Sequence, residues 1–207
     1  RRFGGNDAPV GRWSWKDLAV PSALRPVVLL VALHGAADSV LYLWMSPFLD
    51  SASFAAVPIG PGYVLSWYAV AYMVSRAALV LLPEDWGKRA LLVAPGLLGG
   101  AVLVAGILSR NYRLTAYAYV LGAFLWSAEY PAMVSVLARR TSGRFGAALA
   151  MCGIGASVLT FLGVTGMGWL VGRLPGEAMW RAMALPAFLF PCISIGAAMW
   201  LIRDARK

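Results

Sequence analysis

The chain has 207 residues, of which 60% are hydrophobic and 13% are charged, and its mean hydropathy is +0.71. A soluble domain carries about 25% charged residues, and one soluble core of this length cannot cover so much apolar surface. These values exclude a soluble globular protein and a disordered chain. The net charge of +9 does not indicate a nucleic-acid partner, because in a membrane protein basic residues set orientation. The expected partner of most of the chain is the lipid bilayer.

Residues 1–25 are basic and contain proline and glycine, as expected for a cytoplasmic loop or linker. After them, six stretches reach the length of about 20 apolar residues that a membrane-spanning helix needs. They predict helices over 26–49, 62–82, 90–108, 114–137, 145–172 and 180–202. Residues 26–207 are therefore expected to form one all-α, polytopic transmembrane domain, a bundle of six helices.

Lysine and arginine are distributed unequally between the two ends of the predicted bundle. Basic loops stay in the cytoplasm, so both termini are expected there, in an integral protein of a bacterial inner (plasma) membrane. One side carries 13 of these residues, namely Arg1, Arg2, Arg12, Lys16, Arg25, Lys88, Arg89, Arg139, Arg140, Arg144, Arg203, Arg206 and Lys207. The other side carries 4, namely Arg110, Arg113, Arg173 and Arg181.

The first predicted helix carries polar side chains near its middle. An ionisable group at the bilayer centre costs about 2.5–3.5 kcal/mol, so each one needs a physical reason. His34, Asp38 and Tyr42 follow one another at a spacing of four residues and so share one face of the helix. Asp38 is a candidate for a substrate or proton pathway, and His34 is either a proton relay or a hydrogen-bonded packing residue.

Two further charged groups lie inside predicted helices. Glu129 follows Trp126 in the fourth helix, and Pro131 removes a backbone hydrogen bond nearby, which predicts a kink beside the carboxylate. In the second helix Arg76 continues a stripe with Tyr68 and Tyr72. Arg76 could contact substrate or extend to the membrane surface. Alternatively, Asp38 and Glu129 could form a buried structural pair with Arg76.

The distribution of polar residues among the six helices predicts which of them line a pathway. The first, second and fourth helices contain charged groups, and the fifth contains Ser157, Thr160 and Thr165 among many glycines. The third and sixth have no charged residue in their interiors, so they are expected to face lipid. Deep carboxylates in the first helix of each triplet suggest a 3+3 arrangement.

The sequence lacks the patterns that common membrane enzymes and pumps require. It has a single histidine, no Gly-x-Ser-x-Gly or His-Glu-x-x-His pattern, no nucleotide-binding loop and no cluster of cysteines and histidines. We therefore expect no enzymatic activity, no cofactor and no metal site.

Several motifs follow one another along the second to fifth predicted helices. Ser75-Arg76 precedes the loop Leu82-Pro83-Glu84-Asp85-Trp86-Gly87-Lys88-Arg89. Further along the chain come Glu129-Tyr130-Pro131, Arg139-Arg140, Gly143-Arg144 and Gly153-Ile154-Gly155. In this order the motifs resemble the C-terminal half of a major facilitator superfamily transporter, loosely that of fucose-permease-like sugar carriers. The loop is similar to the family's Gly-Arg-…-Ala-Asp-Arg-Phe-Gly-Arg-Arg, although Ser75 stands where the family has glycine, and the later motifs are similar to its fourth-helix proline, basic loop and glycine-rich fifth helix.

The resemblance implies alternating access and a second six-helix half, supplied upstream in the same chain, by a second copy or by a partner subunit. Residues 1–25 correspond to the family's central cytoplasmic loop, and the family's gate implies a gating role for Glu84, Lys88 and Arg89.

The expected function is secondary active transport, with proton-coupled movement of a small polar solute such as a sugar. Proton-driven efflux of amphipathic cations is an alternative, and a membrane scaffold or assembly subunit without transport activity is another. The pathway is expected to be lined by His34, Asp38, Tyr42, Tyr72, Arg76, Trp126 and Glu129.

Overall fold

The computed structural model describes residues 20–81, 90–141 and 144–205. Within these ranges the chain is all-helical, with six helical segments long and apolar enough to cross a membrane, which confirms this part of the sequence prediction. The predicted gating residues Glu84, Lys88 and Arg89, and most of the predicted linker, lie outside the described residues. The α-helices are α1 (Arg25–Leu49), α2 (Pro61–Val80), α3 (Ala94–Leu108), α4 (Tyr112–Trp126), α5 (Glu129–Arg140), α6 (Phe145–Val171) and α7 (Met179–Asp204).

Proline and asparagine mark several of the helix starts. Pro61 is the first residue of α2, and α1 and α3 also carry proline in their first two positions, where the missing N–H leaves no hydrogen bond unmade. The Asn111 side chain accepts a 3.2 Å hydrogen bond from the Leu114 amide and caps α4. Local sequence therefore fixes where these helices begin.

The fourth membrane span, Tyr112–Arg140, consists of two helices. The sequence predicts a kink at Pro131, and the structure interrupts the helix just before this proline. Helix α4 ends at Trp126, residues 127–128 form a turn whose backbone stays in the right-handed helical region, and α5 begins at Glu129. Pro131 has no N–H to donate to the Ser127 carbonyl four residues earlier. The Ser127 hydroxyl donates to the Phe124 carbonyl at 3.3 Å. Glu129 thus starts a new helix inside the bundle.

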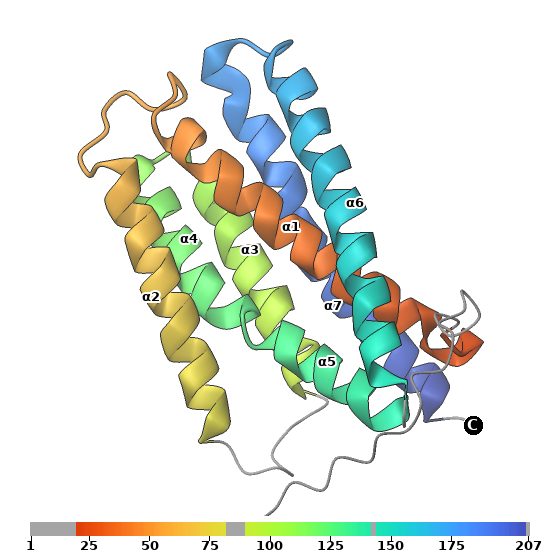
Figure 1. Cartoon of the computed structure of the whole chain (residues 1–207). Helices are drawn as coiled ribbons and strands as arrows, with labels where there is room; N and C mark the ends of the chain where they lie inside the picture. The colour runs from red at the N-terminus through yellow and green to blue at the C-terminus, as the bar shows by residue number, and fades with distance from the viewer. Residues whose placement is uncertain (1–19, 82–89, 142–143, 206–207) are drawn as a thin grey trace, which may run out of the picture.

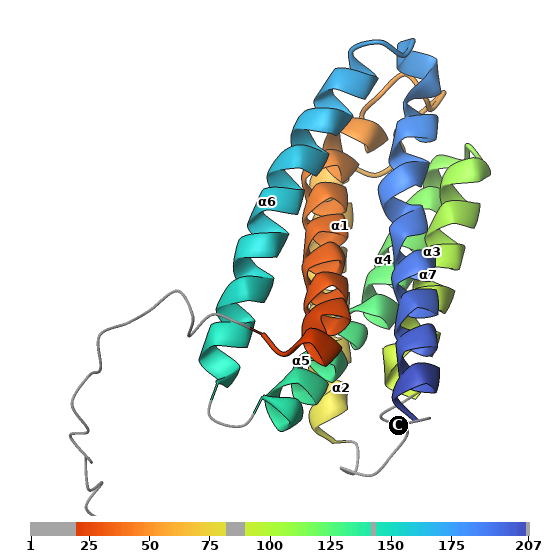
Figure 2. The ribbon, with the colours of Figure 1, turned by 90° about the vertical axis from the view of Figure 1, so that its right-hand side faces the viewer.

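The helices form a bundle in which α1 is the most central element (Figures 1 and 2). Helix α1 lies between α6 on one side and α7 on the other, α3 packs between α7 and α4, and α2 packs on α4. Helix α1 begins and α7 ends at the same end of the bundle. Elements that are far apart in sequence, such as α1 and α7, therefore meet along their lengths.

Two buried apolar clusters follow one another along the bundle. The larger one includes Leu41, Phe48 and Phe190, and the smaller one includes Val31 and Leu137. His34, Glu129 and Ser194 are buried at positions between the two clusters on α1, α5 and α7. A polar layer therefore interrupts the core of the bundle.

Close contacts at glycines join α3 to α4 and α7. A Cβ atom on Gly99 would lie 2.8 Å from the Gly122 carbonyl oxygen, and one on Gly100 would lie 2.9 Å from the Phe190 Cβ and overlap Pro191. Small residues allow helix backbones to approach in this way. Helix α3 is thus packed closely against both α4 and α7.

The exposure of the six spans corrects one sequence expectation. The third and sixth spans, expected to face lipid, each have 39% of an 18-residue apolar window buried, whereas the same window is 17% buried in the second span, α2, and 11% buried in the fifth, α6. Apolar side chains suit both a neighbouring helix and lipid, so the absence of charge does not identify a lipid-facing helix. The least covered helices are α2 and α6, which carry polar residues.

The unequal numbers of lysine and arginine at the two ends of the bundle predict its orientation in the membrane, and this orientation can be tested. A fluorescent reporter fused after Lys207 is expected to fold and fluoresce in the cytoplasm, because the basic end of the bundle is retained there. An alkaline phosphatase fused after Asn111, between α3 and α4, is expected to be active outside the cytoplasm. The reverse pattern would contradict the orientation that the 13-to-4 count of lysine and arginine predicts.

Candidate functional site

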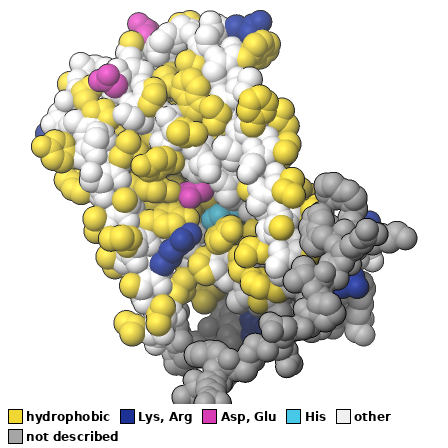
Figure 3. Space-filling view, in the orientation of Figure 1, with side chains coloured by type: hydrophobic (Ala, Val, Ile, Leu, Met, Phe, Trp, Pro, Cys, Tyr) yellow, Lys and Arg dark blue, Asp and Glu magenta, His cyan; other side chains and the backbone are white. Residues whose placement is uncertain are grey.

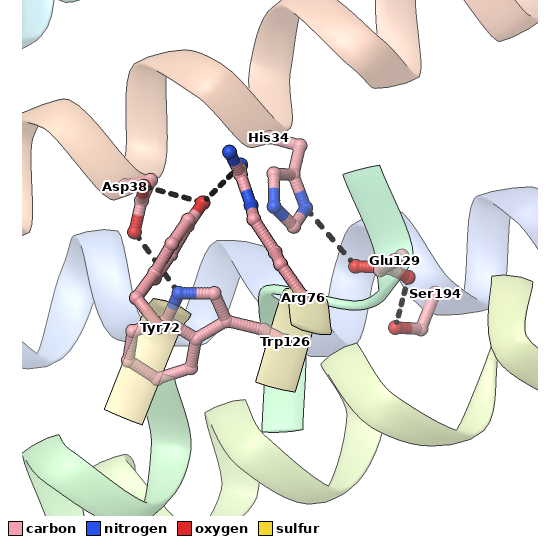
Figure 4. Close-up of polar contacts among 7 residues, drawn as sticks. All are labelled: His34, Asp38, Tyr72, Arg76, Trp126, Glu129 and Ser194. Carbon is pink, nitrogen blue, oxygen red and sulfur yellow. Dashed lines mark hydrogen bonds and ion pairs between the residues drawn. The ribbon is translucent and has the colours of Figure 1, made fainter. Parts of the chain in front are cut away.

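Asp38 of α1 is the centre of an aromatic hydrogen-bond network. Its Oδ1 accepts a 2.5 Å hydrogen bond from the Tyr68 hydroxyl and a 2.9 Å hydrogen bond from the Trp126 indole N–H. Its Oδ2 accepts a 3.0 Å hydrogen bond from the Tyr72 hydroxyl, and Figure 4 shows the contacts with Trp126 and Tyr72. Tyr68 and Tyr72 are one turn apart on α2 and so reach the same carboxylate. Three donors from α2 and α4 therefore hold a half-buried carboxylate in place.

Arg76 extends this network along α2. Its Nη2 donates to the Tyr72 hydroxyl at 3.1 Å, and its guanidinium lies 4.4 Å from the centre of the Tyr72 ring. The side chain therefore points one turn back along α2, toward the middle of the bundle and away from the nearer helix end. This direction does not fit the alternative in which Arg76 extends to the membrane surface.

Neither deep carboxylate forms an ion pair with Arg76 among the residues that the structure describes. The two ion pairs found there join His34 to Glu129 and Arg140 to Asp204. Asp38 connects to Arg76 only through the Tyr72 hydroxyl. The alternative of a buried structural pair between Arg76 and a carboxylate is therefore wrong for the described part of the chain.

Glu129 belongs to a second, fully buried cluster. Its Oε2 lies 3.1 Å from the His34 Nδ1, and its Oε1 accepts a 2.8 Å hydrogen bond from the Ser194 hydroxyl. A Cβ atom on Gly96 would overlap the Glu129 carboxylate and lie 2.5 Å from the Ser194 Oγ. Helices α1, α5 and α7 thus supply the polar side chains, and Gly96 of α3, which has no side chain, leaves room for the Glu129 carboxylate.

The His34 ring has one free nitrogen. Its Nε2 is buried without a hydrogen-bond partner, and the side chain is 1% exposed. The ring packs edge-on against Phe190 at 5.2 Å between centroids and lies 5.9 Å from Tyr130. Aromatic rings therefore enclose the contact between His34 and Glu129.

Trp126 and Phe190 connect the two clusters. The Trp126 ring stacks on Phe190 at 4.4 Å, and its N–H bonds Asp38. The shared helix face predicted for His34, Asp38 and Tyr42 is divided in the structure. His34 joins Glu129, Asp38 joins the aromatic network, and Tyr42 is 47% exposed with its ring 5.7 Å from that of Tyr68.

A hollow of about 620 Å³ lies between α1 and α6. It has hydroxyl groups on both sides, and α6 is the least buried span. The hydroxyl groups of the fifth span therefore line the same hollow as Ser39, which follows Asp38 on α1. The hydroxyl-bearing residues of the lining are Ser39, Ser157, Thr160 and Thr165.

Three residues of the site were not among the sequence candidates. Tyr68 belongs to the predicted stripe with Tyr72 and Arg76 but was not included among the lining residues. Gly96 has no polar side chain, and Ser194 lies in an apolar helix without any distinguishing pattern. Their contacts with Asp38 and Glu129 depend on how α2, α3 and α7 are placed.

Among the described residues, no group of three histidine, cysteine, aspartate or glutamate side chains could hold a metal ion. Comparison of the chain with protein-family models, curated proteins and solved structures finds no match. The resemblance to the major facilitator superfamily rests on the sequence motifs given above.

Proposed function

We propose that this chain is one six-helix half of an alternating-access secondary transporter of the major facilitator kind. It moves a small polar solute, such as a sugar, together with protons. The observation that carries the proposal is the Asp38 network, a carboxylate held by Tyr68, Tyr72 and Trp126 within a bundle of membrane-length helices. Ionisable groups at this depth are costly and characteristically line a solute or ion pathway.

The chemistry of the network suits a polar solute. Asp38 accepts two hydrogen bonds at Oδ1 and one at Oδ2, so Oδ2 has capacity for another donor. Tyr42 and Tyr72 add aromatic faces on which a sugar ring can stack. The Arg76 guanidinium beside Tyr72 disfavours a cationic solute by like-charge repulsion. We therefore prefer a polar solute to an amphipathic cation.

The buried pair of His34 and Glu129 supports proton coupling. The carboxylate lies 3.1 Å from the imidazole and is 0% exposed, so a change in its charge alters the electrostatics of a region that lipid and water do not screen. Trp126 and Phe190 lie between this pair and Asp38. A proton bound by His34 or Glu129 can thus shift Phe190 and Trp126 and, through the Trp126 N–H, change the hydrogen bonds of Asp38.

The exposure of α2 and α6 supports a second six-helix half. These helices carry Tyr72, Arg76 and the hydroxyl groups of the hollow, and they are the least buried spans of the chain. Polar residues on a membrane helix face a bundle interior or a water-filled cavity. The second half, from the same chain, another copy or a partner subunit, would cover this face and place the solute between the halves.

Asp38→Asn tests the proposed solute site. We expect uptake to fall at least about tenfold, because an asparagine amide cannot accept all three hydrogen bonds and a hydrogen bond to a charged group contributes about 1.5–3 kcal/mol. The measurement is uptake of labelled glucose, fucose, glucuronate and lactate into vesicles that contain the full chain in its membrane assembly, with an internal pH dye.

The matched control is Asp50→Asn, because Asp50 is exposed and follows the end of α1. Its uptake should equal that of the unchanged protein. Equal uptake and equal pH dependence in Asp38→Asn would contradict the proposed role. An assembly that moves none of the four solutes, yet holds a stable partner through the α2–α6 face, would favour the scaffold function.

A further inference from the structure

The direction of the Arg76 side chain raises the question of what its charge binds. A guanidinium in the interior of a membrane helix is costly unless it is paired or reaches water. Arg76 folds back onto Tyr72, with 4.4 Å between the guanidinium carbon and the ring centre, so the charge faces the middle of the bundle. Its position calls for a negatively charged partner near the Asp38 network.

Most of the hydrogen-bonding capacity of Arg76 is unused within the described part of the chain. A guanidinium has five N–H donors, and the structure shows a hydrogen bond from Nη2 to the Tyr72 hydroxyl. No carboxylate lies within 4.0 Å of it among these residues, since both ion pairs involve other groups. The side chain is exposed at the face between α2 and α1. Its remaining donors are therefore available to a ligand.

A second, independent group faces the same place. The His34 Nε2 is buried without a partner, while Nδ1 contacts Glu129. The Tyr130 ring is a common neighbour, 5.9 Å from the His34 ring and 6.0 Å from the Arg76 guanidinium. In Figure 4 the free ring nitrogen lies on the side of Arg76, and Figure 3 shows the histidine, an acidic and a basic side chain together in the middle of one face.

We propose that the Arg76 guanidinium and the His34 Nε2 form a subsite for a carboxylate group, and that the transported solute is an organic monoacid. The fork of the guanidinium binds a carboxylate with two parallel hydrogen bonds. A hydrogen on Nε2 would donate to the same ligand. The subsite narrows the class of solute from small polar molecules to small organic monoacids. The claim that this acid is transported rests on the proposed function. A sugar acid is both a polar solute and a monoacid.

The groups around the subsite favour one negative charge over two. Within residues 20–81, 90–141 and 144–205, Arg76 is the basic side chain that lies there, since Arg139 and Arg140 lie in the last turn of α5. Asp38 is joined to Arg76 through the Tyr72 hydroxyl and repels a second negative charge. The other titratable groups facing His34 and Arg76 are Glu129 on α5 and the phenols of Tyr72 and Tyr130 on α2 and α5. A monocarboxylate therefore fits better than phosphate or a dicarboxylate.

Binding to the full chain in lipid nanodiscs tests the subsite directly. The probes are glucuronate and lactate. Glucose is the control without a charge, and inorganic phosphate is the control that is negatively charged but has no carboxylate. Binding is measured by isothermal titration calorimetry. We expect the carboxylates to bind at least tenfold more tightly than glucose and phosphate. Arg76→Gln should weaken carboxylate binding about tenfold to a hundredfold, and Arg76→Lys should weaken it less, because the charge remains while the fork is lost.

Arg173 provides a matched control variant. Its guanidinium also stacks on an aromatic ring four residues earlier, 3.7 Å from the centre of Trp169, at the other end of the bundle. Arg173→Gln should leave carboxylate binding unchanged. The thermal unfolding of Arg76→Gln and Arg173→Gln is measured in parallel, so that a loss of binding with unchanged unfolding assigns the effect to the subsite.

Three results would overturn the proposal. They are carboxylate affinity no better than that of glucose, unchanged carboxylate affinity in Arg76→Gln, and a change of assembly mass in Arg76→Gln, which would assign Arg76 to a contact with the second half. The proposed transport function fails separately. Carboxylate binding without flux contradicts transport and retains the subsite, whereas proton-coupled glucose uptake without carboxylate binding retains transport and contradicts the subsite.

Discussion

Glu129→Gln is expected to remove proton-driven accumulation of solute and the pH dependence of uptake. The glutamine side chain has the same shape and can still contact Ser194, but it cannot take up a proton or carry a negative charge next to His34. Accumulation against a gradient should be lost, because the amide offers no carboxylate that can exchange a proton with the pathway. Exchange of solute across the membrane without net proton movement should remain.

The measurement compares pH-driven accumulation with exchange in the same vesicles. Glu177→Gln is the control, because Glu177 lies in the short helical turn Gly176–Ala178 before α7, at the surface of the bundle. Its accumulation should be unchanged. Full pH-driven accumulation by Glu129→Gln would remove the buried pair from the coupling mechanism and leave it a structural role.

Gly96→Ala is expected to destabilise the protein and disturb the same carboxylate. The new methyl group would overlap the Glu129 side chain and lie 2.5 Å from the Ser194 Oγ. The carboxylate is 0% exposed and held on both sides, so it has little room to move. Overpacking of this kind costs about 1–3 kcal/mol. We expect a lower melting temperature of the nanodisc protein and weaker pH dependence of uptake.

Gly153→Ala is the matched control for this substitution. A Cβ atom on Gly153 of α6 would meet no atom within 4 Å, and alanine favours a helix over glycine by up to about 1 kcal/mol. Its melting temperature should equal or exceed that of the unchanged protein. If Gly96→Ala melted at the same temperature as Gly153→Ala, the close contact between α3 and Glu129 would not hold.

The helices could be predicted from the sequence because each one depends on local information. About 20 apolar residues define a span, and prolines and Asn111 mark the helix starts, so the six spans lie close to their predicted positions. The break before Glu129 could be predicted only in part. Pro131 signals a disturbed helix, but whether the helix bends or ends depends on the surrounding packing.

The contacts of the site could be predicted less well, because they join different helices. Periodicity places His34 and Asp38 on one face of α1, yet their partners come from α5 in one case and from α2 and α4 in the other. Ser194 has no signal in its own apolar helix. The expected exposure of the third and sixth spans was wrong for a related reason, since an apolar surface does not reveal whether protein or lipid covers it.

The glycine contacts of α3 with α4 and α7 have a consequence for how the molecule opens. Backbones that meet at Gly99 and Gly122 leave α3 and α4 little room to separate. Helix α6 packs closely on α1 in the same way, since a Cβ atom on Gly163 would lie 2.7 Å from the Val40 Cγ2. Helix α2 packs mainly on α4 and has three buried residues, Val64, Tyr68 and Ser75. Regions with few buried contacts open first, so we expect the backbone amides of α2 to exchange with solvent before those of α3 and α4.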